Sequence, residues 1–566
     1  DNQYIRVTRG DTGPGTVDPG YPAPTSNWGW PAGFGANGID AALYSHTKCY
    51  FFKDNQYIRV TRGDTGPGTV DPGYPAPTSN WGWPGAFVAD LVRRDAWDLE
   101  SAQTFDPITL AYARAIQVMQ ARPVADPTSW AYQAAIHGTF AAPPAGAEWN
   151  GCQHRGWFFL PWHRMYLYYF ERIVRKAVRD LGGPADFALP YWNYDKTFPS
   201  NTLPPAFRAP TLPDGTANPL FVPAPGRNGT LMTGGQVPAT ATTSAAAMSM
   251  TDFTAPQGVP SFGGSRVGPA HFGNGIGQLE STPHNVMHPT IGGGQVVNPC
   301  RGALMTDPNC AALDPIFWLH HANIDRLWNN WLELPGRANP VEAGWLNQAF
   351  VFHDETGTQV TLSCADVVDT AVQLNYAYDD EIRALQREVE LAAAARPPER
   401  PPELVAASEH PLELVGSTAS VRMTVPASAR ARTAAAGDEG AVLVSIDDVE
   451  ADRDPGLAYA VYLDLPGSPE NERHHIGNVS FFGLTEMNDP DRPHEGHAGF
   501  GQTFDATAAI QALRRQQRWD PASLSVTFEP IEVLPPPGEE LSAAAQAERA
   551  AAIQPVRIGR VGLFVA

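Results

Sequence analysis

Two groups of histidines have the residue type and the spacing to bind metal ions. Each group contains three histidines, on or beside segments rich in aromatic residues: His137, His154 and His163, then His284, His288 and His321. In the second group, His284 and His288 are four residues apart and so share one face of a helix. Neutral imidazole suits copper, zinc, iron and nickel. One such pair occurs often by chance, so the prediction of a site depends on all six residues and their order.

The residues next to these histidines favour copper over the other metals. A zinc hydrolase would have Glu directly after the first histidine of the pair, where this chain has Asn285. A carboxylate-bridged di-iron site would need Glu-x-x-His pairs, and Glu280 precedes His284 at a different spacing. Two copper ions with three imidazoles each would leave open positions between them for O₂. The sequence therefore predicts two copper ions as cofactors.

Helices must position most of these histidines. Residues 162–183 form an amphipathic pattern at helical spacing, and residues 314–336 form another that starts with Asp-Pro and ends with Pro-Gly. A third helix is expected to begin at Asp106, with Asp as N-cap and Pro at the first position. Residues 199–275 are rich in Gly, Pro, Ser and Thr and predict long loops. We therefore expect residues 86–340 to be a mainly α-helical catalytic domain, with a four-helix bundle around the two coppers.

The remainder of the chain predicts β-structure on both sides of this domain. Residues 341–380 contain a strand pair at 345–362 and form a middle region, and residues 381–410 are a linker rich in Glu, Ala, Arg and Pro. Residues 411–566 contain repeated strand patterns that indicate a C-terminal β-sandwich. At the other end, residues 1–31 recur unchanged at 54–84. The predicted architecture is thus multidomain.

Composition narrows the possible functions. The 566 residues are too many for one hydrophobic core. The net charge of −21 argues against nucleic acid as a partner, and no apolar run is long enough to predict a membrane span. Five cysteines do not make a disulfide scaffold, although Cys300 and Cys310 could pair. Because the sequence begins at Asp1, a signal peptide cannot be judged, and localisation stays open.

Two long segments carry a family resemblance. QHRGWFFLPWHRMYLYYFERI (153–173) and DPIFWLHHANIDRLW (314–328) resemble the two copper signatures of the type 3 copper proteins, namely tyrosinases, catechol oxidases and molluscan hemocyanins. The middle region, with Tyr376 and Tyr378, resembles that of plant polyphenol oxidases. The resemblance covers residues 100–380 strongly and 411–566 weakly. It implies that His137, His154 and His163 bind the first copper and His284, His288 and His321 the second, with His320 as a neighbour that is not a ligand.

The N-terminal repeats resemble a different family. The stretch from Ile39 to Val60 is similar to a hemopexin-type repeat, one blade of a small β-propeller. We therefore expect residues 1–85 to be partial, propeller-like hemopexin repeats. They could serve self-association, or they could be a recent duplication with no separate function.

The tyrosinase-like resemblance implies an activity and several further roles. The expected function is O₂-dependent hydroxylation of monophenols and oxidation of o-diphenols to o-quinones, with Glu280 and Asn285 holding a water that deprotonates the phenol. Cys152 would form a thioether with His154. The alternatives are a catechol oxidase, an o-aminophenol oxidase, or a hemocyanin-like O₂ carrier.

The same resemblance implies a latent proenzyme that the C-terminal domain shields. Phe482 is the expected plug over the coppers, with Phe481 and Leu484 as alternatives, although these residues could instead fill the sandwich core. A Phe that covers the site in plant enzymes falls near Pro308 here. That difference predicts an open mouth that admits bulky phenols.

Overall fold

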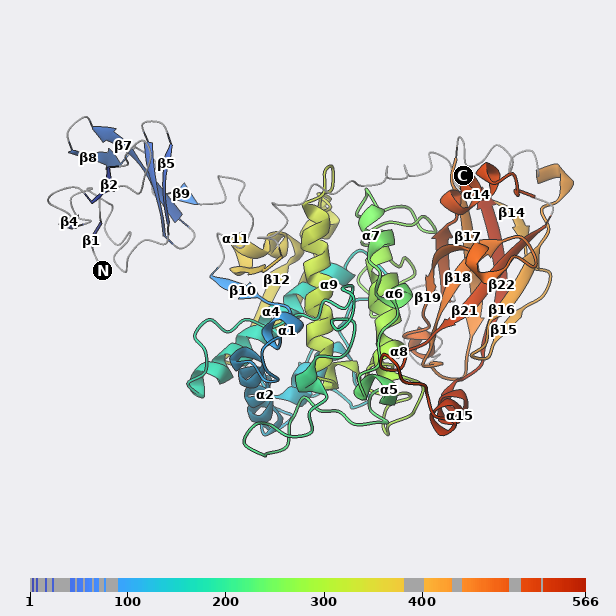
Figure 1. The fold of residues 1–566 in the computed structure, drawn as a ribbon, viewed down its shortest axis with the longest axis horizontal. Coiled ribbons are helices and arrows are strands. Elements are labelled where there is room, and N and C mark those ends of the chain that lie inside the picture. The colour runs from blue at the N-terminus through green and yellow to red at the C-terminus, as the bar shows by residue number, and fades with distance from the viewer. Residues whose placement is uncertain are drawn as a thin grey trace. The chain divides into compact units, whose positions relative to one another are not determined.

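The larger of two compact units contains a helical core and a β-sandwich (Figure 1). The computed structural model describes residues 90–380, 402–429, 440–487, 500–520 and 523–565, together with short strands between residues 3 and 77. One unit comprises residues 1–93 with 369–388, and the other comprises residues 94–368 with 389–566. The predictions of a mainly helical core and of C-terminal sheets are confirmed.

Five helical segments build the part of the core that carries the histidines: α2 (Pro107–Gln120), α3 (Trp130–His137), α4 (Phe159–Asp180), the π-helical segment η5 (Glu280–Asn285) that continues into α8 (Val286–Gly292), and α9 (Ile316–Leu332). Local chemistry fixes two of the starts. The side chain of Asp106 accepts from the Ile108 N–H at 2.9 Å, as the sequence predicts. Ser129 accepts from the Tyr132 N–H at 3.2 Å and so begins α3.

A buried ion pair joins α4 to α9. Nε of Arg164 donates to Asp325 at 2.6 Å, and the two side chains are 0% and 3% exposed. The other guanidinium nitrogens donate to Asn329 Oδ1 at 2.6 Å and to Val367 O at 3.0 Å. The guanidinium carbon also lies 3.6 Å from the centroid of the Trp328 ring. Since α4 carries His163 and α9 carries His321, this pair joins two helices that each supply a histidine to the site.

Shorter elements complete the core: α1 (Ala96–Leu99), η4 (Pro205–Phe207), α5 (Gly229–Met232), α6 (Ala239–Thr242), α7 (Ala245–Ser249), η6 (Ala311–Leu313), α10 (Ala343–Leu346), β11 (Ala349–His353), β12 (Gln359–Ser363) and η7 (Cys364–Val367). Several of these single-turn helices lie in residues 199–275, where long loops are expected. The predicted strand pair begins later than expected, because buried Trp345 lies in α10 and donates to Trp157 O at 3.0 Å. Among the described residues, no helix is long and apolar enough to cross a membrane.

Two antiparallel sheets form the C-terminal sandwich. The first has the order β14-β22-β17-β20, with β15 also on β22, and the second has the order β16-β21-β18-β19. Their bounds are β14 (Glu403–Ala407), β15 (Leu412–Leu414), β16 (Ala419–Met423), β17 (Val442–Glu450), β18 (Ala458–Asp464), β19 (His474–Val479), β20 (Phe500–Asp505), β21 (Leu524–Ile531) and β22 (Val556–Val565). Short helices accompany them: η9 (Glu470–Glu472), α13 (Leu484–Met487), α14 (Thr507–Arg515) and α15 (Ala543–Ala552). Apolar residues from both sheets share one core. Strand β14 lies inside the segment expected to be a linker.

In the smaller unit, Arg93 links the two tyrosines of the middle region. Strand β10 (Leu91–Arg93) pairs in parallel with β13 (Tyr376–Tyr378), which follows α11 (Thr370–Leu374). The Arg93 guanidinium lies 3.7 Å from the centroid of the Tyr376 ring and donates to the Tyr378 hydroxyl at 2.8 Å. The Tyr-x-Tyr motif therefore has a structural role here.

The N-terminal strands do not support the predicted propeller. One sheet joins β5 (Ala41–Ser45), β6 (Lys48–Lys53), β7 (Gln56–Gly63), β8 (Gly66–Val70) and β9 (Ala76–Pro77), and the short pairs are β1 (Gln3–Tyr4) with β4 (Ala23–Pro24) and β2 (Val7–Thr8) with β3 (Thr16–Val17). The two sequence copies pair in the same register, since Gln3 faces Pro24 as Gln56 faces Pro77. No closed sheet is present among the described strands. A propeller ring needs about four or more blades, and this segment contains fewer than two.

Asp325→Ala should destabilise the helical core strongly. It leaves the Arg164 cation buried without its carboxylate, which costs about 3–5 kcal/mol. Urea unfolding of the copper-free chain, followed by tryptophan fluorescence, measures the change. The matched control is Asp180→Ala, which removes the exposed pair with Lys176 and should leave the free energy of unfolding nearly unchanged, because water already screens this pair. Equal small effects of the two substitutions would contradict the proposed role of the buried pair.

Candidate metal centre

Separate elements bring the six predicted histidines into one buried site. His137 is the last residue of α3, His154 lies in the loop before α4, and His163 lies in the second turn of α4. His284 lies in η5, His288 in α8 and His321 in the second turn of α9. Each is at most 3% exposed. The structure therefore brings together all six residues that the sequence singles out.

The first three rings lie close to one another. The ring centroids of His137 and His154 are 5.3 Å apart, those of His154 and His163 are 5.2 Å apart, and those of His137 and His163 are 5.7 Å apart. Their Nε2 atoms are buried and have no hydrogen-bond partner. Three unpaired nitrogen atoms facing a dehydrated interior are costly unless a ligand satisfies them, and a metal ion does so.

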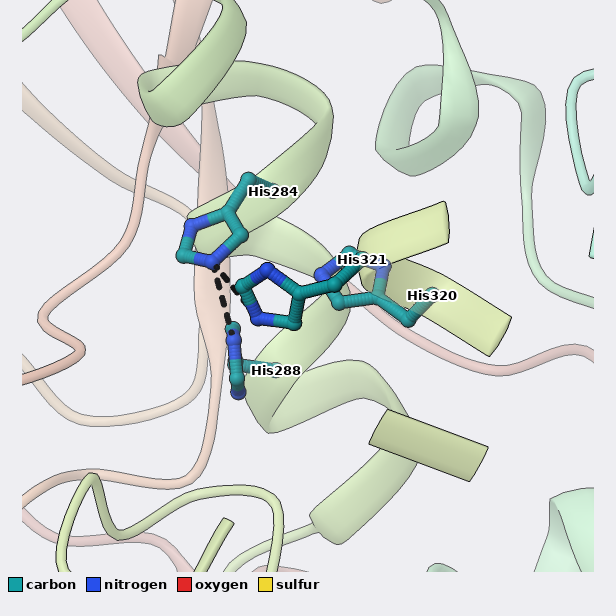
Figure 2. A group of neighbouring side chains, drawn as sticks. All are labelled: His284, His288, His320 and His321. Carbon is teal, nitrogen blue, oxygen red and sulfur yellow. Dashed lines mark hydrogen bonds between the residues drawn. The ribbon is translucent and has the colours of Figure 1, made fainter. Parts of the chain in front are cut away.

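The nitrogen atoms of the second group converge even more closely. Figure 2 shows Nε2 of His284 between Nε2 of His288, at 3.2 Å, and Nε2 of His321, at 3.3 Å. The two groups are adjacent, because the rings of His163 and His321 stack with centroids 4.6 Å apart. These side chains also belong to the described groups whose ligand atoms could share a metal ion. The donor set, all imidazole, fits a pair of copper ions.

Backbone carbonyl groups set the orientation of three rings. Each bond runs from Nδ1 to a carbonyl oxygen: His137 to Pro308 at 3.0 Å, His163 to Phe159 at 2.8 Å and His288 to Met305 at 2.8 Å. His284 donates from Nδ1 to Asn285 Oδ1 at 2.8 Å. A ring that donates from Nδ1 keeps its lone pair on Nε2, the atom that faces the site.

Burial keeps these imidazoles uncharged. It lowers the pKa of His137 to about 4, and it lowers the pKa of His154, His284 and His321 well below the usual value, with neighbouring histidines adding to the effect. Neutral imidazole is the form that binds a metal. The rings are therefore ready to bind at neutral pH without first losing a proton.

His320 lies closer to the second group than the sequence suggests. Its ring centroid is 5.2 Å from those of both His284 and His288, and Figure 2 shows it beside His321. Its Nδ1 is hydrogen-bonded with the Tyr194 hydroxyl at 3.1 Å. The close nitrogen contacts, however, run from His284 to His288 and His321, which favours His321 as the third ligand.

Cys152 lies beside His154, and a second histidine lies beside both. Cys152 Sγ is 3.4 Å from Nδ1 of His154 and 3.0 Å from Nδ1 of His271. His271 O also accepts from the His154 N–H at 3.2 Å. His271 carries no signal in the sequence, because it lies in a Gly- and Pro-rich segment with no recognisable motif.

Glu280 and Asn285 are both buried at the edge of the second group. Both carboxylate oxygens of Glu280 accept from the Arg155 N–H, at 2.7 and 2.9 Å. Burial raises the pKa of Glu280 to about 8. A buried carboxyl group with a raised pKa is a candidate for proton exchange near neutral pH.

The β-sandwich covers the histidines with Phe482. The Phe482 ring stacks on the ring of His288, with centroids 3.8 Å apart and planes at 18°. It also meets the rings of His154 and His284 edge-on, at 5.9 and 6.0 Å. Phe481 and Leu484, the two alternatives, instead belong to the core of the sandwich.

An aromatic residue flanks the mouth, contrary to expectation. Phe272 stacks on His154, with centroids 4.9 Å apart and planes at 13°. Pro308, where the sequence places the missing Phe, supplies only its carbonyl oxygen to His137. Phe272 is thus an aromatic residue beside the first histidine group that the sequence did not single out, and the open mouth stays a prediction.

Polar contacts hold the sandwich on this face of the core. Ser480 donates to Asn285 O at 2.6 Å, and Gln502 donates to Ser281 Oγ and Asn478 O, each at 2.7 Å. Gly483 has a positive φ of 79°, and a Cβ there would lie 2.3 Å from the Phe272 ring. The turn that carries Phe482 therefore fits the core only with glycine at this position.

Four family models match successive parts of the chain. The common central domain of tyrosinase matches residues 127–334, and the polyphenol oxidase middle domain matches residues 340–390. Hemopexin matches residues 39–85, and a domain of unknown function matches residues 401–565.

Relatives and solved structures agree with these matches. The chain is 37% identical to tyrosinase HcTyr1 from Hahella sp. (strain CCB-MM4) over 74% of this chain and 92% of the relative. It is 32% identical to the latent form of a chloroplastic polyphenol oxidase from Prunus armeniaca, and it spans 47% of that protein's length. Latent apple tyrosinase has the same fold, with a TM-score of 0.52 at 23% identity over 84% of this chain and 97% of that one. From the length and identity of the first match, the chain belongs to the tyrosinase and polyphenol oxidase family of oxidoreductases.

Proposed function

We propose that the chain oxidises phenols with O₂ at two copper ions, hydroxylating monophenols and converting o-diphenols to o-quinones. The observation that carries this proposal is the pair of adjacent, dehydrated histidine groups whose nitrogen atoms face one another. His137, His154 and His163 would hold one copper, and His284, His288 and His321 the other. Copper bound there would supply O₂ binding and electron transfer, while the protein supplies orientation and a dry pocket.

Glu280 supports hydroxylation of monophenols as well as oxidation of catechols. A phenol has a pKa near 10 and needs a base to ionise at neutral pH. The burial that raises the pKa of Glu280 would weaken once the site opens and hydrates, and its carboxylate could then accept the proton through a water. Asn285 fixes the ring of His284 beside it. A catechol oxidase or an o-aminophenol oxidase would use the same histidines without this step.

The position of Phe482 supports the proposal that the enzyme is latent, with its site shielded by the β-sandwich. A phenol must bring its ring to the position that Phe482 occupies against His288, and an aromatic side chain fills that space without offering an oxygen. Relatives and similar folds include enzymes whose names describe latent forms. A hemocyanin-like carrier would keep its cover permanently. In this chain, cleavage between about residues 385 and 412 would release the cover.

Two further roles belong to the same proposal. Cys152 would form a thioether with His154, since its sulfur already lies beside that ring. The N-terminal repeats would serve self-association and not chemistry, because none of the six histidines lies in them.

The copper content should depend on His321 and not on exposed histidines. Metal analysis of the purified chain should find about two coppers per chain, and His321→Ala should lose copper and all activity because the second site loses one of three ligands. His410, which is exposed, gives the control His410→Ala with unchanged copper. If His321→Ala kept its full copper content and His320→Ala lost copper, His320 and not His321 would be the ligand.

Glu280→Gln should separate the two reactions. We expect the rate with a monophenol to fall by about 10²-fold or more, and the rate with a catechol to fall by less than about tenfold, because a catechol depends less on the base. Steady-state kinetics on the opened enzyme provide the measurement. Equal losses on both substrates would leave Glu280 with a structural role only.

Phe482→Gly should activate the uncut chain severalfold on a catechol, because it removes the ring that occupies the substrate position. Phe198→Gly, at a phenylalanine that is 55% exposed, is the control and should leave the activity low. If the intact wild-type chain is already as active as the Phe482→Gly variant, the shielding role is wrong.

A further inference from the structure

One disulfide closes a loop between α8 and η6 that touches both histidine groups. Cys300 and Cys310, whose pairing the sequence left open, are bonded to each other and are 5% and 2% exposed. Residues 301–309, here called the disulfide loop, consist of turns and bends, with no helix or strand among them. The disulfide joins the two ends of this segment and so limits the conformations open to it.

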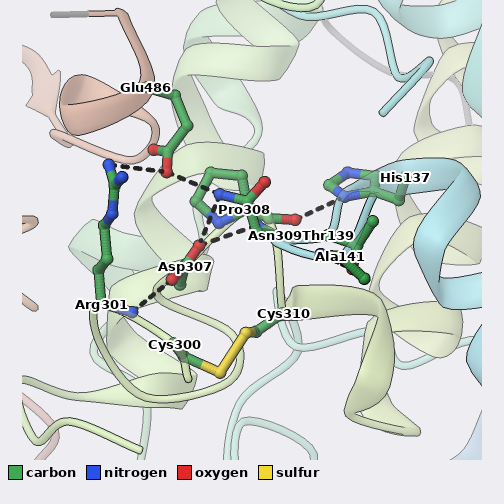
Figure 3. Close-up of a disulfide and its surroundings, with 10 residues drawn as sticks. All are labelled: His137, Thr139, Ala141, Cys300, Arg301, Asp307, Pro308, Asn309, Cys310 and Glu486. Carbon is green, nitrogen blue, oxygen red and sulfur yellow. Dashed lines mark hydrogen bonds and ion pairs between the residues drawn. A yellow bond between two sulfur atoms is a disulfide. The ribbon is translucent and has the colours of Figure 1, made fainter. Parts of the chain in front are cut away.

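Two carbonyl groups of the disulfide loop accept hydrogen bonds from predicted copper ligands. Met305 O accepts from Nδ1 of His288 at 2.8 Å, and Pro308 O accepts from Nδ1 of His137 at 3.0 Å. Figure 3 shows the bond between His137 and Pro308 and, at the end of the same loop, the disulfide. His137 belongs to the first histidine group and His288 to the second. One short segment therefore orients a ring in each group.

Two other rings find their Nδ1 partner close to themselves in sequence. Nδ1 of His163 donates to Phe159 O, one turn earlier in α4. Nδ1 of His284 donates to the side chain of the next residue, Asn285. His137, by contrast, bonds to a carbonyl group 171 residues away. The geometry of a single segment holds the first two partners, whereas the partner of His137 depends on the shape of the disulfide loop.

The disulfide loop packs closely against the ends of two helices that carry ligands. A Cβ on Gly138, at the end of α3, would lie 2.6 Å from Pro308 O. A Cβ on Gly292, the last residue of α8, would lie 2.3 Å from Thr306 Oγ1, and that hydroxyl group donates to Gly293 O at 2.8 Å. Glycine at both helix ends therefore lets the loop approach closely enough for its carbonyl groups to reach the imidazoles.

A carboxylate inside the disulfide loop supports the same turn. Asp307 is 0% exposed, and it accepts from the backbone N–H groups of Arg301 at 2.5 Å and of Asn309 at 2.8 Å. Figure 3 shows these two bonds on opposite arms of the loop. The arms are thus joined from inside by Asp307 and at their ends by the disulfide.

We propose that Cys300 and Cys310 are positioning residues for both copper ions, because their disulfide holds the two carbonyl groups that turn His137 and His288 toward the site. The inference rests on the proposed function, since copper at these histidines is part of it. Loss of the group that orients a ligand ring lowers metal affinity about 10–100-fold. The carbonyl groups belong to the backbone, so no side-chain substitution removes them. Breaking the disulfide is the direct way to displace them.

The double variant Cys300→Ser/Cys310→Ser of the full-length chain gives the first test. The measured quantity is the dissociation constant of each bound copper ion, from competition with a colorimetric Cu(I) chelator. We expect both constants to rise by about 10–100-fold, because one ring in each group loses its orientation. The matched control is Cys364→Ser, which changes a buried cysteine outside any disulfide and should keep both constants. A wild-type constant at either site in the double variant would overturn the inference.

Hydrogen–deuterium exchange of the copper-free chain gives a test that needs neither metal nor activity. In the double variant, residues 133–139 and 286–293, which carry His137 and His288, should exchange faster than in wild type. Residues 167–178 of α4 should exchange as in wild type, because the Nδ1 partner of His163 lies in its own helix. Unchanged exchange in the first two segments would overturn the inference. So would an equal increase in all three, since that describes general destabilisation.

Thr306→Val tests the same loop with both cysteines in place. Valine keeps the shape of threonine and removes the hydroxyl group that donates to Gly293 O. Because this bond ties the loop to the end of α8, the copper held with His288 should bind more weakly than in wild type, by a smaller factor than in the double variant. If the double variant does not fold, this variant decides, and unchanged affinity for both coppers would overturn the inference.

The outcomes separate this inference from the proposed function. If wild type binds two coppers and oxidises no phenol, while the double variant loses affinity, the proposed function fails and the positioning role stands. If phenols are oxidised and the double variant keeps the wild-type affinity, the positioning role fails and the proposed function stands.

Discussion

The dehydration of six imidazoles in one place is the constraint on which the rest of this structure depends. Rings that water cannot reach must be neutral, and their inward nitrogen atoms need a common partner. Backbone carbonyl groups at Pro308, Phe159 and Met305 accept the Nδ1–H groups and so turn the Nε2 atoms toward the site. The hydrogen bonds of the helical core therefore set the orientation of the rings, and this orientation makes the site suitable for metal ions.

The spacing between the two histidine groups has a separate origin. His163 of α4 and His321 of α9 stack, and the buried pair of Arg164 and Asp325 joins the same two helices. A buried ion pair contributes little net stability, yet it is costly to break on one side only. It thus suits a position where geometry matters more than stability, such as the distance between two metal ions.

The contact between the core and the sandwich combines opposite physical tendencies. Phe482 and Phe272 bury apolar rings against the histidines, which favours a closed site. Polar groups meet at the same boundary, where Ser480 donates to Asn285 O and Gln502 donates to Ser281 Oγ, and these groups lose water when the site closes. A contact that combines apolar rings with polar groups can be tight and still releasable.

The sequence by itself determined the six candidate histidines, the helices that carry most of them and the C-terminal sheets, because aromatic helical spacing and strand alternation are local patterns. It determined the N-cap at Asp106 for the same reason. The sequence could not determine whether the N-terminal repeats form a propeller, because ring closure depends on how many blades come together and not on the pattern of one blade.

Only the tertiary structure decided which residues meet across long stretches of chain. His271 and Phe272 reach Cys152 and His154 from a segment without regular spacing, and Phe482, not its neighbour Phe481, turns toward the core because β19 ends at Val479. Asp307, Asp454 and Glu486 are ordinary acids in sequence. Their burial exists only because the helical core and the sandwich exclude water from between them.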